Sequence, residues 1–163
     1  MRKQRCSIKH LIIATLLAFS PVTAQAQTLV VNDHITFGHI AMRNNSAPRD
    51  IQLLSDGDYL ADPAYVFYAD VPQLARLTLT GQVPNHLMDV SIDVAGVEVG
   101  PSGGGAAATF TLVNPFTVPA SVVTDGAGNA TFFVGATLRS DGSGNTYVDA
   151  NYLGVITINV VPN

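Results

Sequence analysis

Apolar and polar residues alternate with a period of two along most of this sequence, and this pattern restricts the fold more than any other feature. In the stretch 87–95, Met88, Val90 and Ile92 share one side of an extended chain, and aspartate or serine separates them. Successive side chains point to opposite faces of a strand, so such a stretch has one core face and one wetter face. We therefore expect eight or nine strands, at 29–31, 35–40, 51–54, 65–68, 74–80, 87–95, 108–113, 130–137 and 153–161.

Turn sequences separate these segments, and Asp-Gly and Gly-Asn pairs recur in them, as in 125–129 and 141–145. Such pairs supply the positive-φ residues of hairpin corners. The segment 115–123 contains two prolines, which cannot donate to a central ladder, so it predicts a further edge strand. Many short antiparallel strands with one apolar face predict an all-β, two-sheet sandwich, with a closed barrel as the alternative.

The first 26 residues have the pattern of a secretory signal peptide. Four cations and no acid occupy residues 1–9, an apolar run covers 11–19, and Ala24-Gln25-Ala26 provides small residues for cleavage. The apolar run is too short for a bilayer, which needs roughly 20 residues. We expect cleavage after Ala26, which leaves a single domain over 27–163 with no membrane insertion of its own.

Charge and cysteine usage exclude several classes of function for the segment 27–163. Four of the eight cations lie in the leader and all twelve acids follow it, so the net charge of this segment is −8, and it has no lysine. Binding to nucleic acid needs clustered Lys and Arg, so we expect none. The only cysteine, Cys6, lies in the leader. Disulfides and cysteine ligands are therefore not expected in the domain.

Residues that could carry chemistry are sparse. The histidines after the leader, His34, His39 and His86, are scattered, and no nucleophile, base and orienting group can be assembled from the sequence. We predict no enzyme and no cofactor. Asp141, Asn145 and Asp149 offer oxygen ligands and are weak calcium candidates, although Asp-Gly is also what an ordinary turn uses.

Four segments together resemble a known family. They are "ITFGHI" (35–40), "ARLTLTGQVPNHLMDVSID" (75–93), "ATFFVGATL" (130–138) and "YLGVITINVV" (152–161). Their order resembles the small exported proteobacterial proteins of the domain of unknown function 4402. Asn85 and Ala136 stand where that family has glycine. The family is similar to Mat-type (common-pilus) and spore-coat-U-type fimbrial subunits.

The resemblance implies an immunoglobulin-like sandwich that lacks one strand, which a neighbouring subunit's N-terminal extension fills by strand addition. The implied partners are further copies or other fimbrial subunits, with a periplasmic chaperone, at the periplasm or surface of a Gram-negative bacterium. In this chain the donor-strand candidates are Leu29, Val30, Val31, Ile35 and Phe37, and the acceptor-edge candidates are Ile156, Ile158 and Val160.

Two alternatives remain open on the sequence alone. The first strand can close the sandwich of its own chain and leave a monomer, because strand addition and self-closure use the same pattern. The chain can also be a secreted module that binds a carbohydrate or calcium, with Tyr59, Tyr65 or the acidic loops as its contacts.

Overall fold

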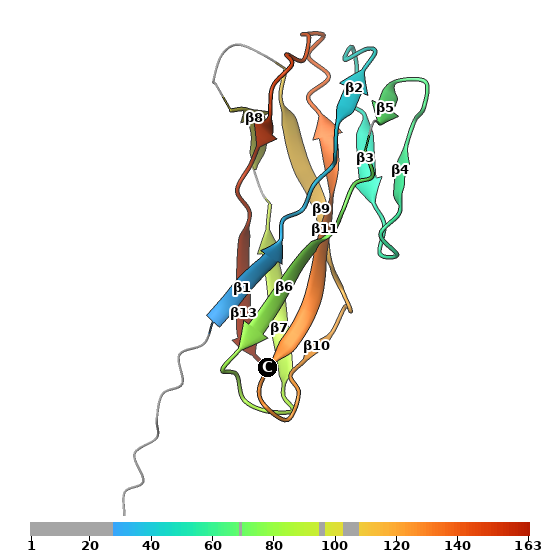
Figure 1. Cartoon of the computed structure of the whole chain (residues 1–163). Coiled ribbons are helices and arrows are strands. Elements are labelled where there is room, and N and C mark those ends of the chain that lie inside the picture. Colours follow the sequence, from blue (N-terminus) through green and yellow to red (C-terminus); the bar gives the residue numbers. More distant parts are fainter. Residues whose placement is uncertain (1–27, 69, 95–96, 103–107) are drawn as a thin grey trace, which may run out of the picture.

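The computed structural model describes residues 28–68, 70–94, 97–102 and 108–163, and the expected leader lies outside these ranges. The described residues form thirteen strands and no helix (Figure 1). Within them, no helix has the length and apolar character to cross a membrane. The strands are β1 (Thr28–Asp33), β2 (Ile40–Met42), β3 (Asp50–Leu53), β4 (Tyr59–Ala61), β5 (Val66–Tyr68), β6 (Ala75–Thr80), β7 (Leu87–Asp93), β8 (Glu98–Pro101), β9 (Phe110–Val118), β10 (Val122–Val123), β11 (Ala130–Ser140), β12 (Tyr152–Leu153) and β13 (Thr157–Pro162).

The large sheet is built around β11, its longest strand. Its order is β1-β6-β11-β9-β8-β12. The first half of β11 pairs with β6, and the second half pairs with β3, which in turn pairs with β4. All of these ladders are antiparallel.

A smaller sheet, β10-β7-β13, packs against the lower half of the large sheet in Figure 1. Strands β2 and β5 form a separate two-stranded ladder. None of these strand orders closes on itself, so the described strands form the expected antiparallel β-sandwich and not the alternative, a closed barrel.

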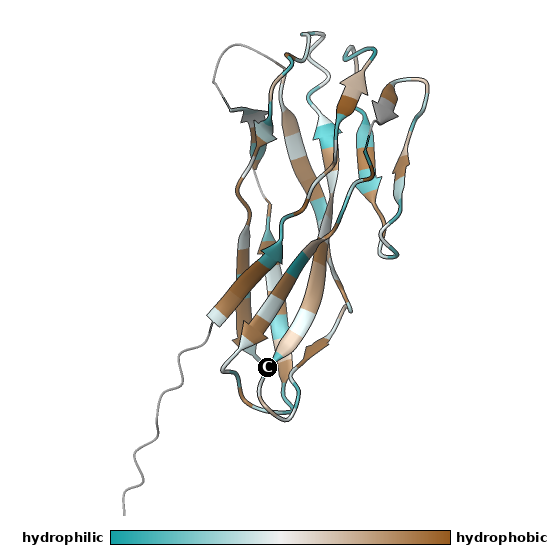
Figure 2. Ribbon diagram, in the orientation of Figure 1, coloured by the Kyte–Doolittle hydropathy of each residue, from teal (hydrophilic) through white to brown (hydrophobic). Residues whose placement is uncertain are grey.

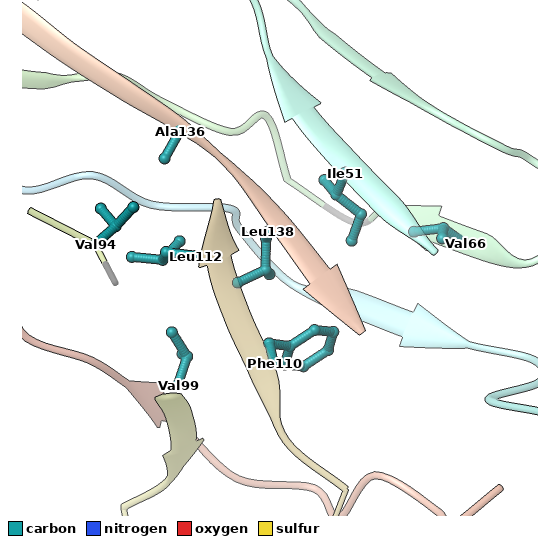
Figure 3. Packing of buried hydrophobic residues seen from close by; sticks show 8 residues of the cluster. All are labelled: Ile51, Val66, Val94, Val99, Phe110, Leu112, Ala136 and Leu138. Atoms are coloured by element: carbon teal, nitrogen blue, oxygen red, sulfur yellow. The ribbon is translucent and has the colours of Figure 1, made fainter. Parts of the chain in front are cut away.

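The apolar core consists of two clusters of buried side chains. One lies between the two sheets and contains Ala75, Leu77, Leu79, Met88, Val122, Phe132 and Val134. The other lies toward the opposite end of the molecule and is shown in Figure 3: Ile51, Val66, Val94, Val99, Phe110, Leu112, Ala136 and Leu138. The alternation in β6 and β11 supplies both clusters, as the sequence predicted.

A β-bulge explains why β9 continues past the predicted end at 113. Gly135 lies opposite Phe116 while Thr137 lies opposite Val113, so two residues of β9 oppose one of β11. The first of them, Asn114, has φ of 50°, a conformation that asparagine tolerates better than most residues. The expected separate strand at 115–123 is therefore wrong: its first half extends β9, and Val122–Val123 forms β10.

Two more expectations need correction. Of the stretch 35–40, only Ile40 belongs to a strand, β2. The residues before it make a single bridge, between Thr36 and Gln73, and then turn at Gly38, whose φ is 69°. The stretch 153–161 is broken, because the chain leaves β12 in one sheet and enters β13 in the other. Asn85 has a positive φ of 53°, a conformation that asparagine adopts more readily than most residues other than glycine.

Candidate functional site: the open edges of β1 and β13

Strand β13 is paired on one side only. Its six residues lie opposite β7, from Thr157↔Asp93 to Pro162↔Met88, without a register shift. No described strand pairs with its other side, which lies along the left of the molecule in Figure 1. Such an edge can accept another strand through its backbone groups.

The register shows which backbone groups of β13 point to that open side. The amide of Asn163 donates to the carbonyl of Leu87 at 3.0 Å, which makes this a hydrogen-bonded pair. Such pairs alternate with non-hydrogen-bonded ones in an antiparallel ladder. The N–H and C=O groups of Ile158 and Val160 therefore point away from β7. Pro162 offers only its carbonyl there.

The inward side chains next to this edge are incompletely covered. Ile156, Ile158 and Val160 pack against the core cluster between the sheets, but each is only half-buried. In the neighbouring strand, Met88 is 3% exposed. The three acceptor-edge candidates therefore lie close together in the structure, at the edge where the core becomes accessible to water.

Strand β1 shows the same feature on the large sheet. It pairs with β6 of its own chain, with Leu29 opposite Leu79 and Val31 opposite Leu77. The two β6 leucines are 1% exposed, whereas Leu29 is half-buried and Val31 is 48% exposed. Val30, on the other face, is 42% exposed. Three of the five donor-strand candidates therefore lie in an exposed edge strand.

The two edges lie on the same side of the sandwich. Leu29 of β1 and Ile158 and Val160 of β13 pack against one cluster, and Figure 2 shows apolar residues along both strands. No ladder joins β1 to β13 among the described residues. A strand added beside β13 would extend the smaller sheet over the inner face of β1, because the two sheets pack face to face.

Polar contacts fix β1 on β6 at a register shift. Asn32 is the extra residue between Val31 and Asp33, and its Oδ1 accepts a hydrogen bond from the Thr78 hydroxyl at 2.7 Å. Arg76 Nε donates to Asp33 Oδ2 at 2.8 Å, and both side chains are about half exposed.

The other two donor-strand candidates have a different environment. Ile35 and Phe37 are half-buried and pack against the core clusters of their own chain. Gly38, directly after them, lies within 3.0 Å of the Asp70 carbonyl oxygen, measured from where a Cβ would stand. The donor-strand candidates therefore divide into an exposed group in β1 and a second group, Ile35 and Phe37, that is anchored to the core.

The acidic loop at 141–149 is organised by hydrogen bonds within the protein. Asp141 accepts hydrogen bonds from the amides of Thr109 and Ser143 and from the side chain of Asn45. Burial tends to raise the pKa of the Asp141 carboxyl, but these hydrogen bonds outweigh it and hold the pKa below its usual value. Of the other calcium candidates, Asn145 accepts from Asn45 through its backbone carbonyl.

The third calcium candidate, Asp149, is exposed. Among the described residues, no group of three His, Cys, Asp or Glu side chains could hold a metal ion.

Sequence reasoning missed Asn45 and an aromatic cluster that cover the end of the sandwich. Asn45 is 7% exposed and binds the loop 141–145 through both side-chain atoms. Tyr147 stacks on Phe110 at 4.3 Å, and Tyr152 meets Phe110 edge-on. Burial, with the nearby charge of Asp141, raises the pKa of Tyr147 to about 12. One indication of this cluster was present in the sequence, the two aromatic residues Tyr147 and Tyr152 near the end of the chain.

The two tyrosines named as possible ligand contacts have different surroundings. The guanidinium of Arg49 lies 3.7 Å from the centre of the Tyr65 ring and covers one face of it. Tyr59 is exposed on β4. Of the histidines, His39 contacts Asp70 on the surface, and the backbone amide of His86 binds Thr124. None of these residues lies in β1 or β13.

Comparison with known proteins gave no match to a family model, a curated protein or a solved structure.

Proposed function

We propose that this chain is an exported, non-catalytic structural subunit of the fimbrial type, with an immunoglobulin-like sandwich. Copies associate by strand addition: the N-terminal strand β1 of one copy pairs with the open edge of β13 in the next. The observation that carries this proposal is the side of β13 that no described strand pairs, where backbone groups point outward beside half-buried apolar side chains.

The geometry of β13 supports strand addition in particular. Over Thr157–Pro162 the open side offers the N–H groups of Ile158 and Val160 and the carbonyls of these residues and Pro162. A backbone hydrogen bond contributes about 0.5–1.5 kcal/mol net. The added strand would also cover Ile158 and Val160, which now contact water. Backbone pairing and apolar burial at one edge are the two contributions to affinity in peptide recognition by strand addition.

The position of β1 supports it as the strand that moves. Among the described strands, β1 pairs with β6 alone, and its residue Leu29 packs against the core. Val30 and Val31 are already 42% and 48% exposed, so these two side chains would lose only part of a full apolar burial on leaving β6. The anchored residues Ile35 and Phe37 would keep the donor segment attached to its own domain.

Val160→Pro tests the proposal directly. The N–H of Val160 points to the open side, so proline there removes no hydrogen bond of the chain's own ladder but removes a donor for an incoming strand. We expect the variant to keep its melting temperature within a few degrees and to lose assembly. Assembly is measured as ladders on denaturing gels without boiling and as mass by light scattering.

Two matched variants complete the test. Val160→Ala trims the side chain but keeps the N–H, so it should still assemble. Asn159→Pro removes an N–H that binds β7, so it should destabilise the fold itself. A folded Val160→Pro variant that assembles like the parent protein would contradict strand addition at β13, and a parent protein that stays monomeric would show that β1 only closes its own sandwich.

A further inference from the structure

Among the described residues, an ion pair between Asp33 and Arg76, at 2.8 Å, joins β1 to β6. It sits at the register shift of the β1–β6 ladder, next to the hydrogen bond between Asn32 and Thr78. These contacts lie on the solvent side of the large sheet, so they do not depend on core packing. At this position β1 and β6 are complementary in charge and in hydrogen bonding.

The edge of β13 offers no such match. The sequences of β7, β10 and β13 contain no lysine or arginine. The outward residues of β13 are Thr157, Asn159 and Val161, and the next strand presents Asp89, which is exposed. A β1 strand lying beside β13 would therefore lose the arginine that pairs with Asp33, and neither β13 nor β7 offers a cation in its place.

We propose that the Asp33 carboxylate selects the edge that β1 occupies: it holds β1 on a β6 edge through Arg76 and opposes its transfer to β13. This inference rests on the proposed function, since it concerns the same strand and the same edge. It makes Asp33 a specificity-determining residue of assembly, which keeps the free subunit self-closed.

The size of the effect follows from the exposure of the pair. Both side chains are about half exposed, and exposed ion pairs change equilibria by about 1.4- to 5-fold. Removing the Asp33 charge should therefore raise the ratio of β13-bound to β6-bound β1 by about two- to fivefold at low salt. The difference should disappear near 1 M salt, where the screening length falls to about 3 Å.

A disulfide reporter can locate β1. Thr28 and Thr80 lie directly opposite each other in the β1–β6 ladder, and no cysteine follows the leader. The pair Thr28→Cys and Thr80→Cys is close enough to bridge when β1 lies on β6. A bridge within one chain reports self-closure, a bridge between chains reports exchange on β6, and assembled chains without a bridge have β1 elsewhere.

The experiment compares Asp33→Asn, Arg76→Gln and the control Asp149→Asn in this background, with the purified exported protein. Asp149 is exposed and distant in sequence, and its replacement makes the same charge change. We expect assembled, unbridged chains to increase two- to fivefold for Asp33→Asn and Arg76→Gln and to stay unchanged for the control. Equal fractions in Asp33→Asn and Asp149→Asn at low salt would overturn the inference.

The outcome also separates this inference from the proposed function. If the parent protein assembles, loses assembly on Val160→Pro and ignores the Asp33 charge, the inference alone is wrong. If no variant assembles and every chain carries an internal bridge, both are wrong.

Discussion

Replacing Asn45 with alanine should destabilise the protein by about 3 kcal/mol, although Asn45 lies in a loop. Its side chain donates to Asp141 Oδ1 and to the carbonyl of Asn145 at 3.2 Å, and its Oδ1 accepts from the amide of Gly142 at 3.1 Å. It is 7% exposed, so water cannot fully replace these bonds. Three hydrogen bonds at about 1 kcal/mol each give the expected magnitude.

Asn45→Ala removes hydrogen bonds of one loop, but it should lower the stability of the whole fold. The loop 141–145 leads directly to Tyr147, whose ring stacks on Phe110 of the core. Tyr147 also donates to the carbonyl of Thr109 at 3.1 Å, so the aromatic cluster keeps one anchor in the variant. The fold should therefore survive with reduced stability rather than lose the end of the sandwich.

Urea unfolding followed by tyrosine fluorescence or circular dichroism measures this change. The midpoint should fall while the slope m stays the same, because the surface exposed on unfolding is unchanged. Asn44→Ala is the matched control: Asn44 is exposed and makes one local hydrogen bond, to the amide of Ser46, so its loss should cost about 0.5 kcal/mol. An Asn45→Ala variant as stable as Asn44→Ala would refute the role assigned to Asn45.

Two further predictions concern acid stability and one close backbone approach. Arg139 donates two hydrogen bonds to Asp50, at 2.7 and 2.8 Å, and holds the pKa of that carboxyl below its ordinary value of 3.8. The stabilisation is therefore present above about pH 4 and is lost as the pH falls through the lower folded-state pKa, so Asp50→Asn should weaken this acid dependence by about 1 kcal/mol in pH-dependent unfolding curves. Gly128→Ala should destabilise the fold by at least about 2 kcal/mol more than Gly57→Ala does, as measured by thermal unfolding. Both glycines have positive φ, but only at Gly128 would a Cβ lie 2.1 Å from a backbone oxygen, that of Gln82. Equal costs for the two glycine variants would contradict the steric argument.

The strands with strict alternation were predictable from the sequence. The segments 74–80, 87–95 and 130–137 correspond to β6, β7 and β11 within a few residues, because each has one fully apolar face. The two-sheet architecture followed from the same pattern. The prediction of a strand at 35–40 was wrong for 35–39, because the alternation there packs Ile35 and Phe37 on the core and the backbone makes one bridge instead of a ladder.

The partners of each strand could not be predicted, since a ladder depends on residues far apart in the chain. The break between β12 and β13 is an example: the apolar pattern runs on through 153–161, but the chain changes sheets. Asn45 gave no signal either, because its partners lie about a hundred residues away. The alternation marked the apolar residues of the candidate edges, and the family resemblance suggested their roles, whereas the match between Asp33 and Arg76 became visible only through the register of β1 on β6.

Amide hydrogen exchange along β13, measured before and after assembly, tests the central claim most directly. In the unassembled protein, the amides of Ile158 and Val160 should exchange fast, and those of Asn159 and Val161, which bind β7, should be protected. On assembly, Ile158 and Val160 should become protected as well. Protection of these two amides in the monomer, or fast exchange in the assembled state, would contradict strand addition at this edge.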